Sequence, residues 1–206
     1  MGGKDLGLTT QGIRAALDRV AARMPTLEHE LNAADGKLGD GDTGVMLRRV
    51  CEKVVEAAKA APDDLGATFK ALAMASAGAT GSSLGTLLTI ALMNIGKGAA
   101  GKTEIDWAEF GALLDHAGKQ MLARGGANLG DKTVVDVVEA VAAALSQLKP
   151  GEAGGPTALN TARETLDRFR DQPCRMGRAR MFGDKSVGVD DPGMMAFVRI
   201  VEAING

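Results

Sequence analysis

Residues 31–47, LNAADGKLGDGDTGVML, place three aspartates, Asp35, Asp40 and Asp42, in a stretch rich in glycine. Apolar positions recur at helical spacing on both sides of it, so the sequence predicts a helix, a pliable loop and a second helix. Three ionised carboxylates about 6 Å apart repel one another by roughly 2 to 3 kcal/mol per pair at an effective dielectric constant near 20. A bound cation would offset this repulsion, and oxygen ligands are those that Mg²⁺ prefers.

An alternative interpretation is that these residues only begin the second helix. Asp and Thr are favoured at helix N-caps, where negative charge suits the positive end of the helix dipole. This accounts for Asp42 and Thr43 but not for Asp35 and Asp40, so the loop alone leaves both interpretations open. An EF-hand is excluded, because the twelfth position counted from Asp40 is a cysteine where that motif needs a bidentate Glu.

The remainder of the chain predicts an all-α protein. Aromatic residues make up 3 % of the sequence and Tyr is absent, which favours helices over sheets. The apolar periodicity predicts eight or nine helices joined by short loops, with sequential neighbours packed antiparallel. A short helix around Glu28 is expected before the aspartate loop, and Asp63, Asp106 and Asp131 are expected at helix N-caps.

Composition limits the class of protein. A length of 206 residues with 45 % hydrophobic residues fits a single domain over residues 1–206, with no internal repeat or boundary. The net charge of −2 offers no basic field for nucleic acid, and no apolar run is long enough for a membrane helix. Two cysteines make no disulfide framework, and the N-terminal MGGKDLGLTT lacks the apolar core of a signal peptide, so a cytoplasmic location is expected.

Residues 96–103, GKGAAGKT, match the P-loop pattern GxxxxGK[ST], and their first six residues also match GxGxxG. Both motifs require a preceding buried strand and a helix that begins at the glycines. Here the preceding LGTLLTIALMNI has the character of a helix, and no other segments resemble parallel strands. The sequence therefore predicts a flexible turn between two helices.

Three further segments have the composition of a phosphate site. SAGATGSSLGT (76–86) and RGGANLGDKT (124–133) place glycines and hydroxyls before helix starts, where free N–H groups attract anions. Residues 172–190 have no periodicity, and a structureless stretch of that length is more often a functional loop than filler. In and beside it stand five cations, for which solvated surface charge is the alternative: Arg170, Arg175, Arg178, Arg180 and Lys185. Together with the acidic loop, these parts are those needed to hold a metal-bound polyphosphate.

Four motifs then carry a resemblance over nearly the whole chain: LGDGDTG, GATGSSLGT, GGANLGDKT and GRARMFGDKSVGVDDPG. In this order and spacing the chain resembles the nucleotide-binding L subunit of dihydroxyacetone kinase, the DAK2 domain family. The resemblance implies a barrel of eight antiparallel amphipathic helices, with ADP or ATP bound in the loops at one end through two Mg²⁺ ions. It also implies a kinase subunit that transfers a phosphoryl group to dihydroxyacetone or a related short keto-sugar.

The resemblance implies site residues by motif. Asp35, Asp40 and Asp42 would be the metal ligands, and Arg178 would stabilise charge on the transferred phosphate. The residues expected around the nucleotide are Thr43, Gly44, Val45, Met46, Ala79, Thr80, Gly125, Arg178, Asp191, Pro192 and Gly193.

The resemblance also implies partners. In such kinases a histidine of a separate K subunit holds the sugar, and His29 and His116 of this chain fall outside every motif. The chain is therefore expected to be inactive alone and to act with a K-type subunit. The phosphoryl donor would be ATP, or a phosphotransferase-system protein that rephosphorylates bound ADP.

Four positions depart from the family pattern. Thr43 replaces a His, Met46 an Asn, Lys185 an Arg and Val189 a His. An imidazole donates and accepts hydrogen bonds, which Val189 cannot do. These departures motivate one alternative, a nucleotide-dependent binding or regulatory module without transfer activity. A second alternative is a fatty-acid kinase domain, a DAK2 relative that also carries DGDTG, although the short chain and the segment from GRA to DPG disfavour it.

Overall fold

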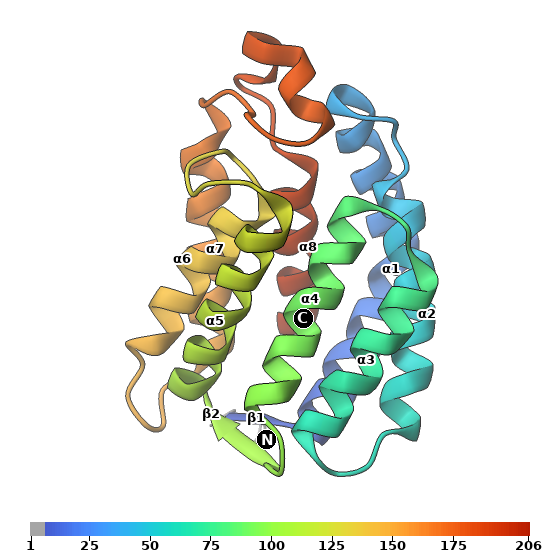
Figure 1. Cartoon of the computed structure of the whole chain (residues 1–206), viewed down its shortest axis with the longest axis vertical. Coiled ribbons are helices and arrows are strands. Elements are labelled where there is room, and N and C mark those ends of the chain that lie inside the picture. The colour runs from blue at the N-terminus through green and yellow to red at the C-terminus, as the bar shows by residue number, and fades with distance from the viewer. Residues whose placement is uncertain (1–6) are drawn as a thin grey trace.

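The computed structural model describes residues 7–206. The prediction that the chain starts without a signal peptide concerns residues that lie partly outside this range. Within residues 7–206 the chain forms eight α-helices, one 3₁₀ segment and a two-stranded antiparallel sheet (Figure 1). In chain order the elements are β1 (Gly7–Thr9), α1 (Thr10–Leu38), α2 (Thr43–Ala60), α3 (Leu65–Ala79), α4 (Ser83–Gly98), β2 (Glu104–Asp106), α5 (Trp107–Gly125), α6 (Val134–Ser146), α7 (Gly154–Arg170), η1 (Arg178–Ser186) and α8 (Pro192–Asn205).

The helices close into an antiparallel barrel, which confirms the predicted fold class. Each helix packs against the next along the chain, and α8 returns to pack against α1. In Figure 1 the loop between α1 and α2 and the 3₁₀ segment η1 lie at the upper end, whereas β1 and β2 lie at the lower end. Because the helices alternate in direction, α2, α4, α6 and α8 all begin at the upper end. None of the helices in the described part of the chain is long and apolar enough to cross a membrane.

Burial explains why these segments are helical. In α2 the core-facing residues recur at helical spacing, as at Met46, Val50 and Val54. The exception is α6, whose first turns bury valines at almost every position because α6 packs against α5, α7 and α8. Val is a modest helix former, so the conformation of α6 is decided by packing.

The prediction of a separate short helix around Glu28 is wrong. A single helix, α1, runs from Thr10 to Leu38 through Pro25. A proline inside a helix costs about 3 kcal/mol, because it removes an N–H donor and crowds the preceding turn. The neighbouring Met24 and Leu27 are fully or almost fully buried, and each such side chain stabilises the fold by about 1.5 to 3 kcal/mol. Their burial offsets the cost of the proline and keeps the helix continuous.

The predicted helix starts are partly confirmed. Asp106 caps α5 as predicted. The prediction for Asp63 is wrong, because the adjacent Asp64 caps α3 while Asp63 accepts a hydrogen bond from the Thr10 hydroxyl. The prediction for Asp131 is also wrong, because Thr133 caps α6. In both cases the helix begins one or two residues later than expected, which is the usual uncertainty at helix ends.

Residues 172–190 are not structureless as predicted, since they contain η1. Part of this segment packs on the end of α1 in a small apolar cluster of its own, formed by Leu38, Cys174 and Ala179, with Phe182 and Val189 against it. This packing holds the loop above the barrel.

Candidate functional site

A cavity of about 650 Å³ opens at the upper end of the barrel. Its lining includes the first residues of α2, α4, α6 and α8, among them Thr43, Ser83, Val134 and Pro192. Each helix N-terminus carries a partial positive charge, so four helix dipoles point at one space. Such a site favours an anion with several charged groups.

The three aspartates meet at the mouth of this cavity. Asp35, Asp40 and Asp42 each offer a carboxylate oxygen, and these oxygens all lie within 4.8 Å of one another. Asp35 is buried, whereas Asp40 and Asp42 are exposed. Convergent carboxylate oxygens that remain open to solvent fit a magnesium ion, which keeps several waters and takes only part of its shell from the protein.

Side chains of α1 hold the start of α2. Asp35 Oδ2 accepts hydrogen bonds from the amides of Asp42 (2.9 Å) and Thr43 (3.2 Å). Asn32 Oδ1 accepts from the next two amides, of Gly44 (2.8 Å) and Val45 (3.2 Å). Asp42 stands at the N-cap position of α2, but its own side chain makes no capping bond. The carboxylate of Asp42 is therefore left for the cluster. The role of Asn32 could not be predicted from the sequence, because the amides that it binds lie on the other side of the loop.

Two glycines allow this arrangement. A Cβ atom at position 44 would lie 2.2 Å from the carbonyl oxygen of Glu28, so Gly44 is needed for the close approach of α2 to α1. A Cβ atom at position 39 would lie 2.2 Å from Oδ1 of Asp35. Because Gly39 has no Cβ, it leaves room for Oδ1 of Asp35, the oxygen that does not cap α2.

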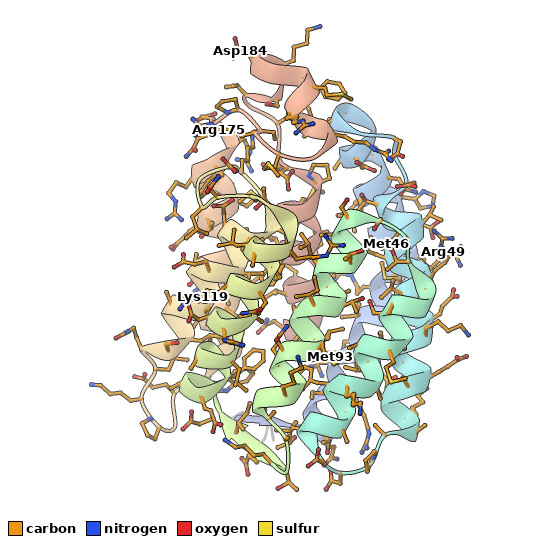
Figure 2. All side chains as sticks on the ribbon, viewed as in Figure 1. Met46, Arg49, Met93, Lys119, Arg175 and Asp184 are labelled. Atoms are coloured by element: carbon orange, nitrogen blue, oxygen red, sulfur yellow. The ribbon has the colours of Figure 1, made fainter. Side chains whose placement is uncertain are left out.

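Arg178 lies opposite the aspartates at the start of η1. Its guanidinium forms an ion pair with the carboxylate of Asp40, although the Arg178 side chain remains 63 % exposed. Figure 2 places Arg175 and Asp184 in the same upper loop, above the barrel. An exposed cation beside a carboxylate cluster can exchange that contact for a phosphate oxygen.

The structure brings most of the predicted site residues to the cavity. Besides the three aspartates and Arg178, its lining contains Thr43, Met46, Gly125, Asp191, Pro192 and Gly193. Four predicted residues lie beside the lining and are not part of it: Gly44, Val45, Ala79 and Thr80. Thr80 packs on Gly85 and accepts a hydrogen bond from the amide of Ser82, which shapes the turn into α4. The nucleotide contacts of all these residues remain predictions.

Four apolar residues of the cavity lining are missing from the predicted set. Leu84, Leu87, Met121 and Val134 lie in its lining. In the sequence they belong to the apolar faces of helices and cannot be distinguished from core residues. They provide an apolar wall of the kind that receives a planar ring in ligand sites.

Asp191 combines a helix cap with a perturbed carboxyl group. Its Oδ1 accepts from the amide of Met194 at 2.9 Å, at the start of α8. Burial raises the pKa of Asp191 to about 6, and hydrogen bonds from the Met194 and Gly193 amides and the charge of Lys132 only partly offset this effect. The carboxyl group therefore changes charge between acid and neutral pH.

Other suspected motifs lie outside the cavity lining. Lys102 of the P-loop-like segment forms an ion pair with Glu109, in the turn before β2 and the start of α5. His29 and His116 are exposed residues of α1 and α5. Val189 packs on the apolar cluster of Leu38, Cys174 and Ala179.

Comparisons with known proteins identify the family of this chain. A family model described as the DAK2 domain matches residues 37–206. The chain is 36 % identical over 185 residues to L-erythrulose 1-kinase of Mycolicibacterium smegmatis, which covers 86 % of this chain and 32 % of that protein. It therefore spans about a third of the length of that relative. It is 26 % identical over 193 residues to the ADP-binding subunit DhaL of the PEP-dependent dihydroxyacetone kinase of Escherichia coli, covering 91 % of this chain and 92 % of the subunit.

A solved structure shares the fold. It is the dihydroxyacetone kinase from C. freundii in complex with AMP-PNP and Mg²⁺, with a TM-score of 0.72 and 23 % identity, covering 98 % of this chain and 35 % of that one. The family match extends over most of the chain and includes Asp40, Asp42 and the later glycine-rich loops, whereas Asp35 lies two residues before it. The chain belongs to the DAK2 domain family.

Proposed function

We propose that residues 1–206 act as one cytoplasmic domain, the Mg-nucleotide-binding and phosphoryl-transferring subunit of a kinase for dihydroxyacetone or a related short keto-sugar. The observation that carries the proposal is the convergence of three carboxylates, within 4.8 Å of one another, at a cavity that also receives Arg178 and four helix N-termini. This is an arrangement for charge neutralisation, and phosphoryl transfer depends mainly on positioning and electrostatic stabilisation.

In this proposal Asp35, Asp40 and Asp42 hold two Mg²⁺ ions. When bound, the ions would neutralise phosphate charge and orient the phosphoryl group. Asp35 offers one oxygen, since the other caps α2. The apolar wall at Leu87 and Met121 accepts the base of ADP or ATP, which leaves the phosphates beside the helix N-termini.

Arg178 serves the transferred group. Its guanidinium donates N–H groups to the phosphoryl oxygens, where negative charge is spread during transfer. Because Arg178 pairs with Asp40 and is exposed, it can turn to the phosphate without leaving a buried charge behind. No nucleophile of this chain takes part in the proposal.

The acceptor sugar is held by a partner. The two larger relatives named above are about three times as long as the segment they share with this chain. We infer a K-type subunit that supplies the sugar site, which the name of the E. coli relative, a subunit of a dihydroxyacetone kinase, supports. Erythrulose and dihydroxyacetone kinases are both among the relatives, which supports a short keto-sugar as the acceptor. The name of the E. coli relative supports bound ADP rephosphorylated by a phosphotransferase-system protein, and exchanging ATP is the other donor mode.

The first test is calorimetric titration of ADP and ATP into the purified chain, with and without Mg²⁺, after mass spectrometry for nucleotide that co-purifies. We expect Mg-dependent binding or trapped ADP. Absence of both would contradict the proposed site. Binding without any transfer to dihydroxyacetone or erythrulose, with a cognate K-type subunit present, would favour the nucleotide-dependent regulatory module, which the replacements at Thr43 and Val189 motivate.

A further inference from the structure

Lys132 is a buried cation at the base of the loop that carries Arg178. The residue is 1 % exposed, and its φ angle of 62° lies in the left-handed region that residues other than glycine rarely adopt. It directly precedes Thr133, which caps α6 and lines the cavity. Lys132 itself is absent from the cavity lining, so it does not act on a ligand there by contact.

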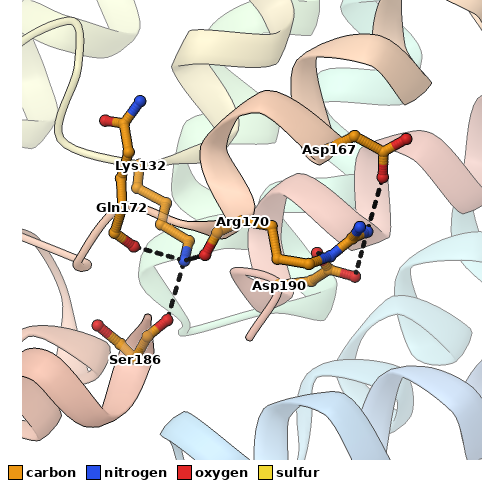
Figure 3. Close-up of polar contacts among 6 residues, drawn as sticks. All are labelled: Lys132, Asp167, Arg170, Gln172, Ser186 and Asp190. Atoms are coloured by element: carbon orange, nitrogen blue, oxygen red, sulfur yellow. Dashed lines mark hydrogen bonds and ion pairs between the residues drawn. The ribbon is translucent and has the colours of Figure 1, made fainter. Parts of the chain in front are cut away.

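All three donors of the Lys132 ammonium are used on backbone carbonyls. Nζ donates to the carbonyl oxygens of Arg170 (2.9 Å), Gln172 (2.8 Å) and Ser186 (3.0 Å), as Figure 3 shows. Arg170 and Gln172 stand where the chain leaves α7, and Ser186 ends η1. One side chain thus joins the two ends of the loop, residues 172–186, that contains Arg178.

A second set of contacts closes the same base. The carbonyl oxygen of Arg170 also accepts from the amide of Gly188 at 2.9 Å. The Arg170 guanidinium pairs with Asp190 (2.8 Å) and Asp167 (2.7 Å), beside the Lys132 contacts in Figure 3. Away from this base, the described contacts of the loop include the apolar cluster on Leu38 and the ion pair of Arg178 with Asp40. The clamp of Lys132 is therefore one of the contacts that fix the base of this loop, together with the bond from the Cys174 amide to Oγ of Ser186 (2.8 Å).

We propose that Lys132 is a positioning residue: by joining both ends of residues 172–186 it holds Arg178 beside the carboxylate cluster. The part of this inference that concerns phosphoryl transfer rests on the proposed function. The part that concerns the loop does not. A methionine at position 132 would keep an unbranched side chain but remove a donor from three carbonyls, of which only that of Arg170 keeps another, the amide of Gly188.

The position of the loop can be measured without nucleotide. Met181 is 78 % exposed on η1, and Arg49 lies on the outer side of α2 in Figure 2, so Met181→Cys and Arg49→Cys provide a spin-label pair. The natural Cys51 and Cys174 are buried and should stay unlabelled. In Lys132→Met we expect a broader or shifted distance distribution. Lys119→Met, an exposed lysine of α5, is the matched control and should leave the distribution unchanged. An unchanged distribution in Lys132→Met would overturn the proposal.

The role in nucleotide binding requires a double-mutant cycle with Mg²⁺ and AMP-PNP. We expect Lys132→Met to weaken binding about tenfold in the wild-type background, through loss of a charge-assisted contact of Arg178. In the Arg178→Ala background the same change should weaken binding less than about twofold, because the contact is already gone. Equal losses in both backgrounds would mean a general structural role and would overturn the positioning of Arg178.

Two further outcomes are separable. If the wild-type chain binds no Mg-nucleotide while the label distances still depend on Lys132, the proposed function fails and the positioning of the loop stands. If Lys132→Met does not fold, Lys132→Gln takes its place in the label measurement, because its amide has two N–H donors and so loses at least one of the three bonds of the ammonium. A distance distribution equal to that of the wild type would overturn the proposal.

Discussion

The guanidinium of Arg178 pairs with the carboxylate of Asp40, and this contact joins the start of η1 to the loop between α1 and α2. Asp40 also belongs to the cluster with Asp35 and Asp42. One carboxylate therefore faces both a cluster suited to metal and a cation suited to phosphate. The positive charge of Arg178 offsets part of the repulsion among the three aspartates.

Replacement of Asp40 tests the carboxylate cluster. We expect Asp40→Asn to weaken Mg-dependent ADP binding by about tenfold to a hundredfold, the effect of losing one contact to a charged group. The helical circular dichroism should not change, because Asp40 is exposed in a loop. Asp184→Asn, at the tip of η1 in Figure 2, is the control and should bind normally. Binding that is unchanged in Asp40→Asn would refute its role as a metal ligand.

Replacement of Asn32 tests the support of α2. Asn32→Ala removes the acceptor for the amides of Gly44 and Val45, and we expect a loss of about 1 to 2 kcal/mol in the free energy of unfolding. Asn32→Asp keeps an acceptor oxygen and should lose less. Urea titration measures both variants, with Gln11→Ala, at an exposed position of α1, as the control. A loss in Asn32→Ala no larger than that of the control would show that these bonds do not stabilise α2.

The raised pKa of Asp191 predicts a pH-dependent stability. In the folded state this carboxyl group keeps its proton up to about pH 6, whereas in the unfolded chain it loses the proton near pH 4. The folded state is therefore penalised as the pH rises from about 4 to 6, and the penalty persists above 6. Asp191→Asn keeps an N-cap residue without the charge. Its stability relative to the wild type should increase over that pH range, as measured by thermal unfolding, and a constant difference would contradict the raised pKa.

Lys102 distinguishes this site from a P-loop. Its ammonium pairs with Glu109 close to β2, at the lower end of Figure 1, away from the cavity. We expect Lys102→Met to leave Mg-nucleotide affinity unchanged within about twofold and to cost at most about 1 kcal/mol of stability, as for an exposed ion pair. A loss of affinity as large as that expected for Asp40→Asn would place the nucleotide at the lower end of the barrel and contradict the proposed site.

The helices and the acidic loop could be predicted from the sequence because their signals are local. Apolar residues at helical spacing indicate a buried face whatever its partner. Three aspartates among glycines suit a cation, although the loop alone leaves a helix N-cap open as the alternative. The continuous α1 could not be predicted, because its proline is a local signal to stop. The burial of Met24 and Leu27 against other helices decides against that signal.

The sequence by itself determined the helix content, the aspartate loop and, through four ordered motifs, the family. Only the tertiary structure decided which residues share the cavity, that Asn32 and Asp35 hold α2, and that Lys132 joins the ends of the loop of Arg178. The physical reason is the range of the interactions. Helix periodicity and turn chemistry act over a few residues, whereas these hydrogen bonds join one element to another, over 7 residues from Asp35 to Asp42 and over 54 residues from Lys132 to Ser186.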